Sequence, residues 1–376
     1  VGFLIGALMF SGTVPMIIYY GVQMINPKFL LVTAFILSAL LSTITGTSWG
    51  AAGTIGVAIM GIAGGLGVSL PATAGAVVSG AFFGDKLSPL SDTTNLAPMA
   101  AGSELYEHIK HMLYTTIPAA IVSLIVYAIV GLTAHGDMIT PESVTLMMEQ
   151  LDSMFKFNIV LLLPIVLVIT GSLRKWPTIP TMLGTSILTI LLGVIFQGFS
   201  IVDGFASLVS GFDLTMTGFT GEATQEVIKL INRGGVASVT STTVLIFCAM
   251  GFAGIVSVSG MLDVVLDLLL SKVKSTVGII LATIASCATV AFVTGSSYLS
   301  ILIGELFKEA YPRKNLHPKN LSRTLEDSGT VLVPLIPWSA AGAYMASTLG
   351  VPTLEYLPWA VLNYTGIIFA IIWAVT

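Results

Sequence analysis

The amino-acid sequence predicts an all-α polytopic membrane protein built from two inverted repeats, each with a re-entrant hairpin and a broken transmembrane helix. Of its 376 residues, 55% are hydrophobic and only 9% are charged, whereas about a quarter of an average soluble domain is charged. The mean hydropathy of +0.96 agrees with this imbalance. Two further observations indicate the repeats: short polar runs interrupt several hydrophobic regions, and the runs in the two halves of the chain resemble one another.

Several uninterrupted hydrophobic segments are long enough to cross a bilayer, which takes about 20 apolar residues. They lie near residues 1–21, 113–133, 158–173, 178–198, 237–258 and 352–375. Each is expected to form a single transmembrane helix.

Each half also contains one hydrophobic region whose centre is polar. In the first half, residues 29–44 lead into a tip at residues 45–50, which reads Thr-Gly-Thr-Ser-Trp-Gly. In the second half, residues 276–293 lead into a tip at residues 294–298, which reads Thr-Gly-Ser-Ser-Tyr. Polar backbone at membrane depth is tolerated only where it lines a cavity or is buried in protein. Both regions therefore predict re-entrant hairpins.

A polar break follows each hairpin along the chain. In residues 84–98 it begins Gly-Asp-Lys-Leu-Ser-Pro-Leu-Ser-Asp-Thr-Thr-Asn. This run disfavours a helix because Pro89 lacks a backbone donor and the short polar side chains compete for backbone hydrogen bonds. In residues 326–337 the break begins Glu-Asp-Ser-Gly-Thr and contains two prolines. We expect a broken transmembrane helix at both places.

These features divide the chain into three parts. A first repeat covers residues 1–135, connecting spans and outer loops cover residues 136–236, and a second repeat covers residues 237–376. A two-fold repeat of interrupted hydrophobic segments indicates a secondary transporter whose substrate site lies at the repeat interface. The alternative is coincidence, because short apolar windows rich in Gly, Ser and Thr match easily.

Basic residues indicate that the two hairpins enter the membrane from opposite sides. Cytoplasmic loops carry an excess of Lys and Arg. Only Lys28 flanks the first hairpin, which is therefore expected to enter from outside. The loops that flank the second hairpin carry Lys272, Lys274, Arg313, Lys314, Lys319 and Arg323. The second hairpin is therefore expected to enter from the cytoplasm, which makes the two repeats inverted.

The tips and the first break carry the oxygen atoms that an alkali cation prefers. Freed carbonyl groups and hydroxyl groups supply such oxygens, and the C-terminal ends of broken helices favour cations while their N-terminal ends favour anions. The expected cation-binding residues are Thr47, Ser48, Thr93, Thr94, Asn95, Thr294, Ser296 and Ser297.

Proton coupling requires a group that loses and regains a proton near neutral pH. Burial among apolar side chains favours the neutral form of a carboxyl group. The candidates are Asp92, Asp85 and Asp327, and Asp92 is preferred because hydroxyl and amide side chains flank it. Lys86 is expected to pair with Asp85 or Asp327, or to carry a proton itself. Two structural alternatives stay open: Asp85 and Lys86 form an ion pair that only fixes the broken helix, or Asp327 caps a half-helix.

The run Gly-Asp-Lys-Leu-Ser-Pro-Leu-Ser-Asp-Thr-Thr-Asn-Leu-Ala, the first tip and Ser-Gly-Thr-Val-Pro at residues 11–15 resemble the NhaC family of bacterial sodium/proton antiporters. The likeness extends over nearly the whole chain. It implies exchange of sodium for protons across the bacterial cytoplasmic membrane. Our own hypothesis from the residues is that sodium binds at Asp92, Asn95 and Ser48, and no cofactor is expected, because the sodium ion is the substrate. The chain is similar, more loosely, to ion transporters that pair re-entrant hairpins with broken helices and often form homodimers.

Other functions remain as alternatives or are excluded. A sodium- and proton-coupled carboxylate exchanger of the malate/lactate type uses the same scaffold, and Lys86 or a helix N-terminus then receives the carboxylate. An enzyme is disfavoured because the sequence shows no nucleophile elbow or metal-ligand set. The lipid bilayer is the expected environment, and nucleic acid is not expected as a partner because no basic tract with interleaved aromatic residues occurs.

Overall fold

The chain folds into helices throughout the part described by the structure, which is a computed structural model. The described residues are 2–133, 141–174, 176–240, 275–297, 301 and 303–375, together with isolated positions between 243 and 264. Within these ranges no strand occurs, so the expected all-α class is confirmed. Five described helices are long and apolar enough to cross a membrane, and four further pairs of helices qualify together but are bent at a short break.

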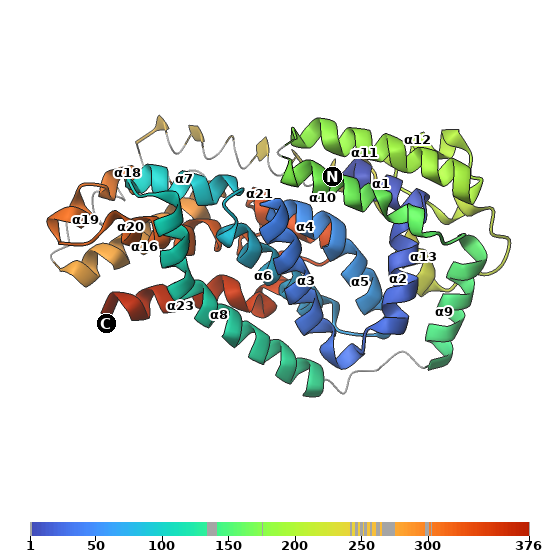
Figure 1. Ribbon diagram of the computed structural model, residues 1–376, viewed down its shortest axis with the longest axis horizontal. Helices are drawn as coiled ribbons and strands as arrows, with labels where there is room; N and C mark the ends of the chain where they lie inside the picture. Colours follow the sequence, from blue (N-terminus) through green and yellow to red (C-terminus); the bar gives the residue numbers. More distant parts are fainter. Residues whose placement is uncertain are drawn as a thin grey trace.

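The first half supplies the centre of the molecule (Figure 1). The helices of the first half that lie there are α3 (Leu30–Thr45), α4 (Ser48–Ala51), α5 (Val57–Leu66), α6 (Leu70–Leu87), α7 (Asp92–Ala101) and α8 (Leu105–Thr133). The π-helical segment η2 (Ala52–Gly56) joins α4 to α5, so that Ser48–Leu66 forms one continuous helix. The side chain of Ser69 caps the start of α6 by accepting from the backbone of Ala72.

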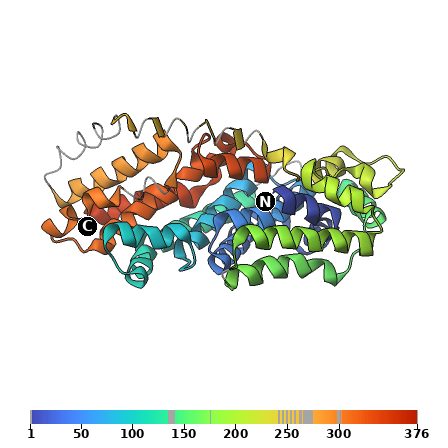
Figure 2. The same cartoon turned by 90° about the horizontal axis from the view of Figure 1, so that it is seen from above.

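A second group of helices gathers at the end of the molecule that is on the right in Figures 1 and 2. It contains α1 (Gly2–Phe10), α2 (Thr13–Met24), α9 (Pro141–Met154), α10 (Leu163–Leu173), α11 (Thr178–Leu192), α12 (Ile201–Val209) and α13 (Gln225–Ile231). Short helical turns accompany them: η1 (Pro27–Phe29), η3 (Ile159–Leu162), η4 (Gly193–Gln197), η5 (Leu214–Thr217) and η6 (Ala237–Val239).

The second half lies mostly at the opposite end, beside α7 and α8 (Figure 1). Its helices are α16 (Thr276–Thr294), α18 (Gly304–Phe307), α19 (Ala310–Arg313), α20 (Pro318–Leu325), α21 (Ala340–Leu349), α22 (Thr353–Tyr356) and α23 (Val361–Val375). The shorter segments are η7 (Glu326–Thr330), η8 (Val333–Leu335) and η9 (Leu357–Trp359). Tip residue Tyr298, the basic residues Lys272 and Lys274, and much of the expected span at 237–258 lie outside the described residues.

Two of the expected spans are bent rather than straight. The expected span at 1–21 consists of α1 and α2, which meet at 71°, because Gly12 between them adopts a left-handed conformation with φ of 81°. The expected span at 352–375 bends by 55° where η9 passes into α23. Sequence hydropathy gave the location of these apolar segments but carried no sign of the bends.

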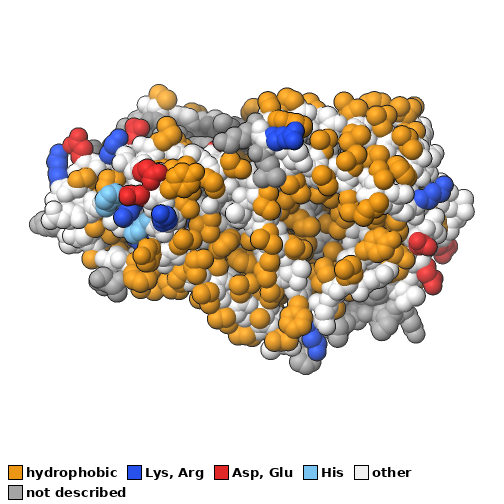
Figure 3. Space-filling model, in the orientation of Figure 1, with side chains coloured by type: hydrophobic (Ala, Val, Ile, Leu, Met, Phe, Trp, Pro, Cys, Tyr) orange, Lys and Arg blue, Asp and Glu red, His pale blue; other side chains and the backbone are white. Residues whose placement is uncertain are grey.

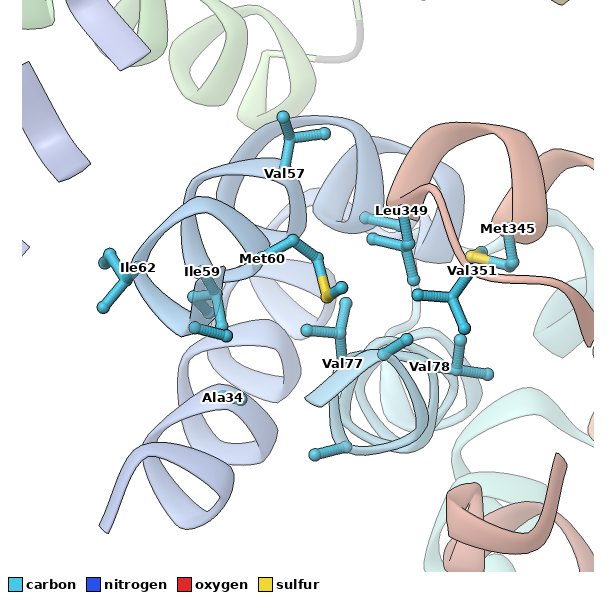
Figure 4. Packing of buried hydrophobic residues seen from close by; sticks show 14 of the residues in the cluster. Ala34, Val57, Ile59, Met60, Ile62, Val77, Val78, Met345, Leu349 and Val351 are labelled. Atoms are coloured by element: carbon cyan, nitrogen blue, oxygen red, sulfur yellow. The ribbon is translucent and has the colours of Figure 1, made fainter. Parts of the chain in front are cut away.

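A shared hydrophobic core joins the two halves. Figure 4 shows Met60 of α5 and Val77 of α6 facing Leu349 of α21 and the following Val351. These side chains are at most 3% exposed. Helix α21, which follows the second break, therefore packs firmly against α5 and α6 of the first half.

The outer surface is apolar over most of the face seen in Figure 3, and the charged side chains on that face lie mainly at its two ends. Many large hydrophobic side chains of α8 are exposed, Ile121, Ile125 and Ile129 among them. A soluble protein rarely exposes such a large apolar patch, and this distribution suits a surface covered by lipid.

Candidate functional site

A cavity of about 1350 Å³ lies between the described residues of the two polar tips, at 45–50 and 294–297, and the first helix break. The sequence-predicted site residues that line it are Thr47, Ser48, Asp85, Asp92, Thr93, Asn95, Thr294, Ser296 and Ser297. Three others do not line it: Lys86, Thr94 and Asp327. The fold thus brings polar residues from distant parts of the chain to one cavity, and it leaves the predicted lysine and one predicted aspartate behind the cavity wall.

The first tip forms because α3 ends at a glycine. Gly46 adopts a left-handed conformation with φ of 70° and donates its N–H to the carbonyl of Ser42, as is common at helix C-termini. Thr47 then starts α4, and its hydroxyl accepts from the N–H of Gly50 at 3.3 Å. The end of α3 and the start of α4 therefore both face the cavity.

The second tip repeats this arrangement. Helix α16 ends at Gly295, which has φ of 65°, and the hydroxyl of Thr294 donates to the carbonyl of Val290 at 2.6 Å. Ser296 and Ser297 follow and line the cavity. The tip therefore presents hydroxyl groups to the same space as the first tip.

Each tip glycine packs against the helix break of its own half. A Cβ atom added at Gly46 would lie 2.6 Å from the Cβ of Leu90, and one added at Gly295 would lie 2.9 Å from the Cα of Ser339. Only a residue without a side chain allows such close approach, since real Cβ contacts are longer. The tip and the break are therefore held together in both halves.

The first break lies between Leu87, where α6 ends, and Asp92, where α7 begins. The side chain of Ser91 caps α7 by accepting from the N–H of Thr94. The hydroxyl of Thr94 in turn donates to the carbonyls of Asp85 at 3.0 Å and Lys86 at 3.2 Å. Thr94 therefore satisfies the end of α6 rather than facing the cavity.

Asn95 stabilises the same break through its amide group. Its Nδ2 donates to the carbonyls of Pro89 at 2.9 Å and Ser91 at 2.7 Å. The hydroxyls of Ser91 and Thr93 lie 3.2 Å apart. The amide nitrogen of Asn95 is thus occupied by backbone, and its carbonyl oxygen is the atom suited to a cation.

Asp85 and Asp92 occupy different environments at this cavity. Asp85 is 8% exposed, and its Oδ2 accepts from the hydroxyl of Ser48 at 2.8 Å. Asp92, in the first turn of α7, is exposed to the cavity. The structure therefore places the buried carboxylate of Asp85 against the first tip and the open carboxylate of Asp92 near the cavity surface, whereas sequence reasoning preferred Asp92 over Asp85.

Lys86 pairs with Asp327, and this contact selects between the two partners that the sequence left open. Both side chains are buried, at 2% and 0% exposure. The Oδ1 of Asp327 also accepts from Thr115 of α8 at 3.1 Å, and the Nε of Arg323 lies 4.0 Å from its Oδ2. The pair therefore connects α6 of the first half to η7 of the second.

Glu326 and Asp327 lie within a helix, so Asp327 caps no half-helix. Helix α20 begins at Pro318 and continues into the π-helical segment η7, which contains both acids. The break itself comes after Leu335, and α21 begins at Ala340 with Ser339 as its cap. Glu326 is fully buried beside the site, and sequence reasoning gave it no role. The sequence feature that could have indicated Glu326 is its position as an acidic residue next to Asp327 in an apolar region.

The ends of four helices surround the cavity. The C-terminal residues of α3 and α16 line it, and helix C-termini carry partial negative charge. The N-terminal residues of α7 and α21 also line it and carry partial positive charge. Asp92 offsets the positive end of α7, whereas the first turn of α21 has no acidic residue. The cavity as a whole favours a cation, and α21 offers the place best suited to an anion.

Transition-metal chemistry has no support among the described residues, where no group of three or more His, Cys, Asp or Glu side chains could hold a metal ion. His108 and His111 contact Ser322 at 2.8 Å and Asn320 at 2.9 Å, respectively. These two histidines join α8 to α20.

A lipid-facing helical fold with a cavity to which helix ends, hydroxyl groups and carboxylates contribute is typical of a membrane transporter for ions. Comparison with known proteins gives the family. The model of the Na+/H+ antiporter family matches residues 17–94 and 80–376. The chain belongs to this family and is a multi-pass protein of the bacterial inner membrane.

Individual relatives resemble the chain over almost its whole length. An uncharacterized Na(+)/H(+) antiporter of Haemophilus influenzae is 52% identical over 99% of this chain and 80% of the relative. The Na(+)/H(+) antiporter NhaC of Alkalihalophilus pseudofirmus is 41% identical over 96% of this chain and 77% of the relative. A malate-2H(+)/Na(+)-lactate antiporter of Bacillus subtilis is 36% identical over 100% of this chain and 79% of the relative.

Proposed function

We propose that this chain exchanges sodium for protons at the cavity between its two halves, and that Asp85 and Asp92 are the carboxylates at which the two ions compete. The observation that carries the proposal is the position of Asp85, a nearly buried carboxylate that lines the cavity and accepts a hydrogen bond from Ser48 of the first tip. Family membership supports the same function.

Competition follows from the cost of a buried charge. A carboxylate removed from water is costly unless a cation or a proton neutralises it. Lys86 does not supply that charge to Asp85, because it is paired with Asp327. Either a sodium ion or a proton therefore neutralises Asp85, and binding of one displaces the other.

Sodium binding in the cavity involves oxygen atoms that surround these carboxylates. Asp92 offers an open carboxylate, and Asn95 and Ser48 offer a carbonyl and a hydroxyl oxygen on the same wall. The C-terminal ends of α3 and α16 add partial negative charge. Thr47, Thr93, Thr294, Ser296 and Ser297 supply further hydroxyl groups around the cavity.

The inverted repeat belongs to this proposal, and matching capping residues support it. Gly46, Ser91 and Gly102 end or begin helices in the first half as Gly295, Ser339 and Gly350 do in the second. The three pairs lie at nearly the same separation along the chain. We propose that each half forms one repeat, with a re-entrant hairpin whose tip packs on its own broken helix.

A second candidate function is sodium- and proton-coupled exchange of a small carboxylate. It is favoured by the N-terminal end of α21, whose residues Ala340 and Ala341 line the cavity without a nearby acidic residue in that helix. Helix N-termini bind carboxylates readily. The cavity of about 1350 Å³ also has room for an organic acid.

The test is sodium-driven proton movement in proteoliposomes that contain the purified chain and a pH-sensitive dye. A sodium gradient is expected to move protons without any organic acid present. We expect Asp85→Asn to abolish this movement and Asp92→Asn to reduce it at least tenfold, while Glu305→Gln, a change at an exposed carboxylate outside the cavity, leaves it unchanged. Full exchange by Asp85→Asn would refute the assignment.

The same vesicles separate the two candidate functions. If protons move only when malate or lactate is added, the carboxylate exchanger is the correct function and simple sodium/proton exchange is not. A homodimer stays a prediction from the family resemblance, and the mass of the purified chain in lipid nanodiscs tests it.

A further inference from the structure

The second half contains a buried carboxylate to which the proposed exchange assigns no role. Glu326 is 0% exposed, and neither of its carboxylate oxygens has a hydrogen-bond partner among the described residues. The hydroxyl of Thr330, which lies at the other end of η7, is also without a partner there. By contrast, Asp85 accepts from Ser48, and Asp327 accepts from both Lys86 and Thr115.

Neither neighbouring cation forms an ion pair with Glu326. Lys86 forms its ion pair with Asp327, and the Nε of Arg323 lies 4.0 Å from the other carboxylate oxygen of Asp327. Lys86 and Arg323 thus both lie beside Asp327, while the adjacent Glu326 has no basic side chain in contact within the described part of the chain. A buried carboxylate in this situation is neutralised either by a bound cation or by a proton.

Glu326 lies directly behind the cavity wall. The charges of Asp85 and Lys86 and the hydroxyl groups of Thr93 and Thr330 lie close enough to interact with its carboxyl group. Asp85, Thr93 and Thr330 line the cavity, and Glu326 does not. The segment that carries Glu326 is π-helical, and such segments within α-helices are frequent at functional sites.

We propose that Glu326, Thr330, Thr93 and Asp85 form a second cation-binding site, deeper than the one at Asp92, which takes an alkali cation such as sodium. All its donors are carboxylate and hydroxyl oxygens, which suit hard cations rather than transition metals. Asp85 belongs to both sites, because it lines the cavity and its charge interacts with Glu326. This inference rests on the proposed sodium exchange.

The experiment measures stabilisation of the purified chain by sodium. A ligand that binds only the folded state raises the apparent Tm, and the slope against the logarithm of its concentration increases with the number of ions bound. Sodium chloride replaces choline chloride at constant ionic strength in detergent solution. The proteins are the native chain, Glu326→Gln, Thr330→Val, Asp92→Asn and the exposed control Glu305→Gln.

We expect the native chain and Glu305→Gln to show the same slope, and Glu326→Gln and Asp92→Asn each to show about half of it. Thr330→Val removes one oxygen ligand, so it is expected to need several-fold more sodium for the same shift. A double variant with Glu326→Gln and Asp92→Asn is expected to show no shift. Glutamine has the shape of glutamate, and a monodisperse elution profile with native Tm in choline identifies correctly folded variants.

Two results would overturn the second site: a native slope in Glu326→Gln, which means that Glu326 is neutral through its own proton, or complete loss of the slope in Asp92→Asn alone. A wrong proposed function would give a different result. In that case the native chain moves no protons in response to sodium in vesicles, whatever the dependence of Tm on sodium concentration in the variants.

Discussion

The two halves of the molecule use the same backbone devices but place their acidic residues differently. In both, a helix ends at a left-handed glycine that packs against a serine-capped break. In the first half, Asp85 and Asp92 face the cavity. In the second half, Glu326 and Asp327 lie behind the cavity wall at 0% exposure. Similar caps therefore do not imply similar charge positions, and the two pairs of acids are expected to respond differently to substitution.

This difference distinguishes acids that act in ion transport from acids that stabilise the fold. Acids that face the cavity can bind ions without supporting the fold, since water or an ion replaces any partner they lose. Asp327, in contrast, joins three helical segments through Lys86, Thr115 and the nearby Arg323. We therefore expect substitutions at the cavity to change transport and substitutions of the Lys86–Asp327 pair behind it to change stability.

The largest effect is expected from Lys86→Met, which leaves the Asp327 carboxylate buried without its ion partner. Removal of one member of a buried pair costs about 3–5 kcal/mol. The yield of monodisperse protein and its apparent Tm, measured by size-exclusion chromatography and thermal unfolding, are expected to fall sharply. Asp92→Asn is the matched control, because it removes an exposed charge and is expected to keep the native Tm in choline chloride without sodium.

The double variant Lys86→Met with Asp327→Met sharpens this prediction. Because hydrophobic residues often replace a buried ion pair without loss of stability, the double variant is expected to recover most of the Tm. If the double variant is as unstable as Lys86→Met, the loss comes from packing around Lys86 rather than from an unpaired charge.

A smaller effect, on transport alone, is expected from Ser48→Ala in the first tip. The Ser48 hydroxyl donates to the carboxylate of Asp85, and hydrogen bonds to charged groups contribute about 1.5–3 kcal/mol. The sodium concentration for half-maximal exchange is expected to change by about tenfold or more, with an unchanged Tm. Thr294→Val in the second tip is expected to change it less than about twofold, since that hydroxyl already donates within its own helix. Equal shifts in both variants would contradict the asymmetry.

The sequence predicted the helical class and the family because both depend on signals that are local in the chain. The low content of charged residues predicted a membrane protein, and the glycine-containing tips predicted several of the residues that line the cavity. The bend between α1 and α2 was missed, because one left-handed glycine changes the direction of a segment without changing its hydropathy.

The sequence could not show which acid is the better candidate for proton coupling, because that depends on how deeply each carboxyl group is buried in the fold. Asp92 has more polar neighbours along the chain than Asp85, yet the first is exposed and the second is nearly buried. The partner of Lys86 is likewise 241 positions away. Glu326 received no role because its lack of partners is visible only once the surrounding helices are in place.

The smallest effect is expected at the caps of the two breaks, and it tests whether the breaks are equally fixed. The Ser339 hydroxyl accepts from Gly342 at 2.8 Å and also contacts the carbonyls of Val333 and Ile336. The Ser91 hydroxyl accepts from Thr94 at the longer distance of 3.5 Å. Loss of a helix cap costs about 0.5–2 kcal/mol, so Ser339→Ala is expected at the upper end and Ser91→Ala at the lower end. Thermal unfolding compares them, and a larger loss of Tm in Ser91→Ala would show that the first break, not the second, is the more firmly fixed.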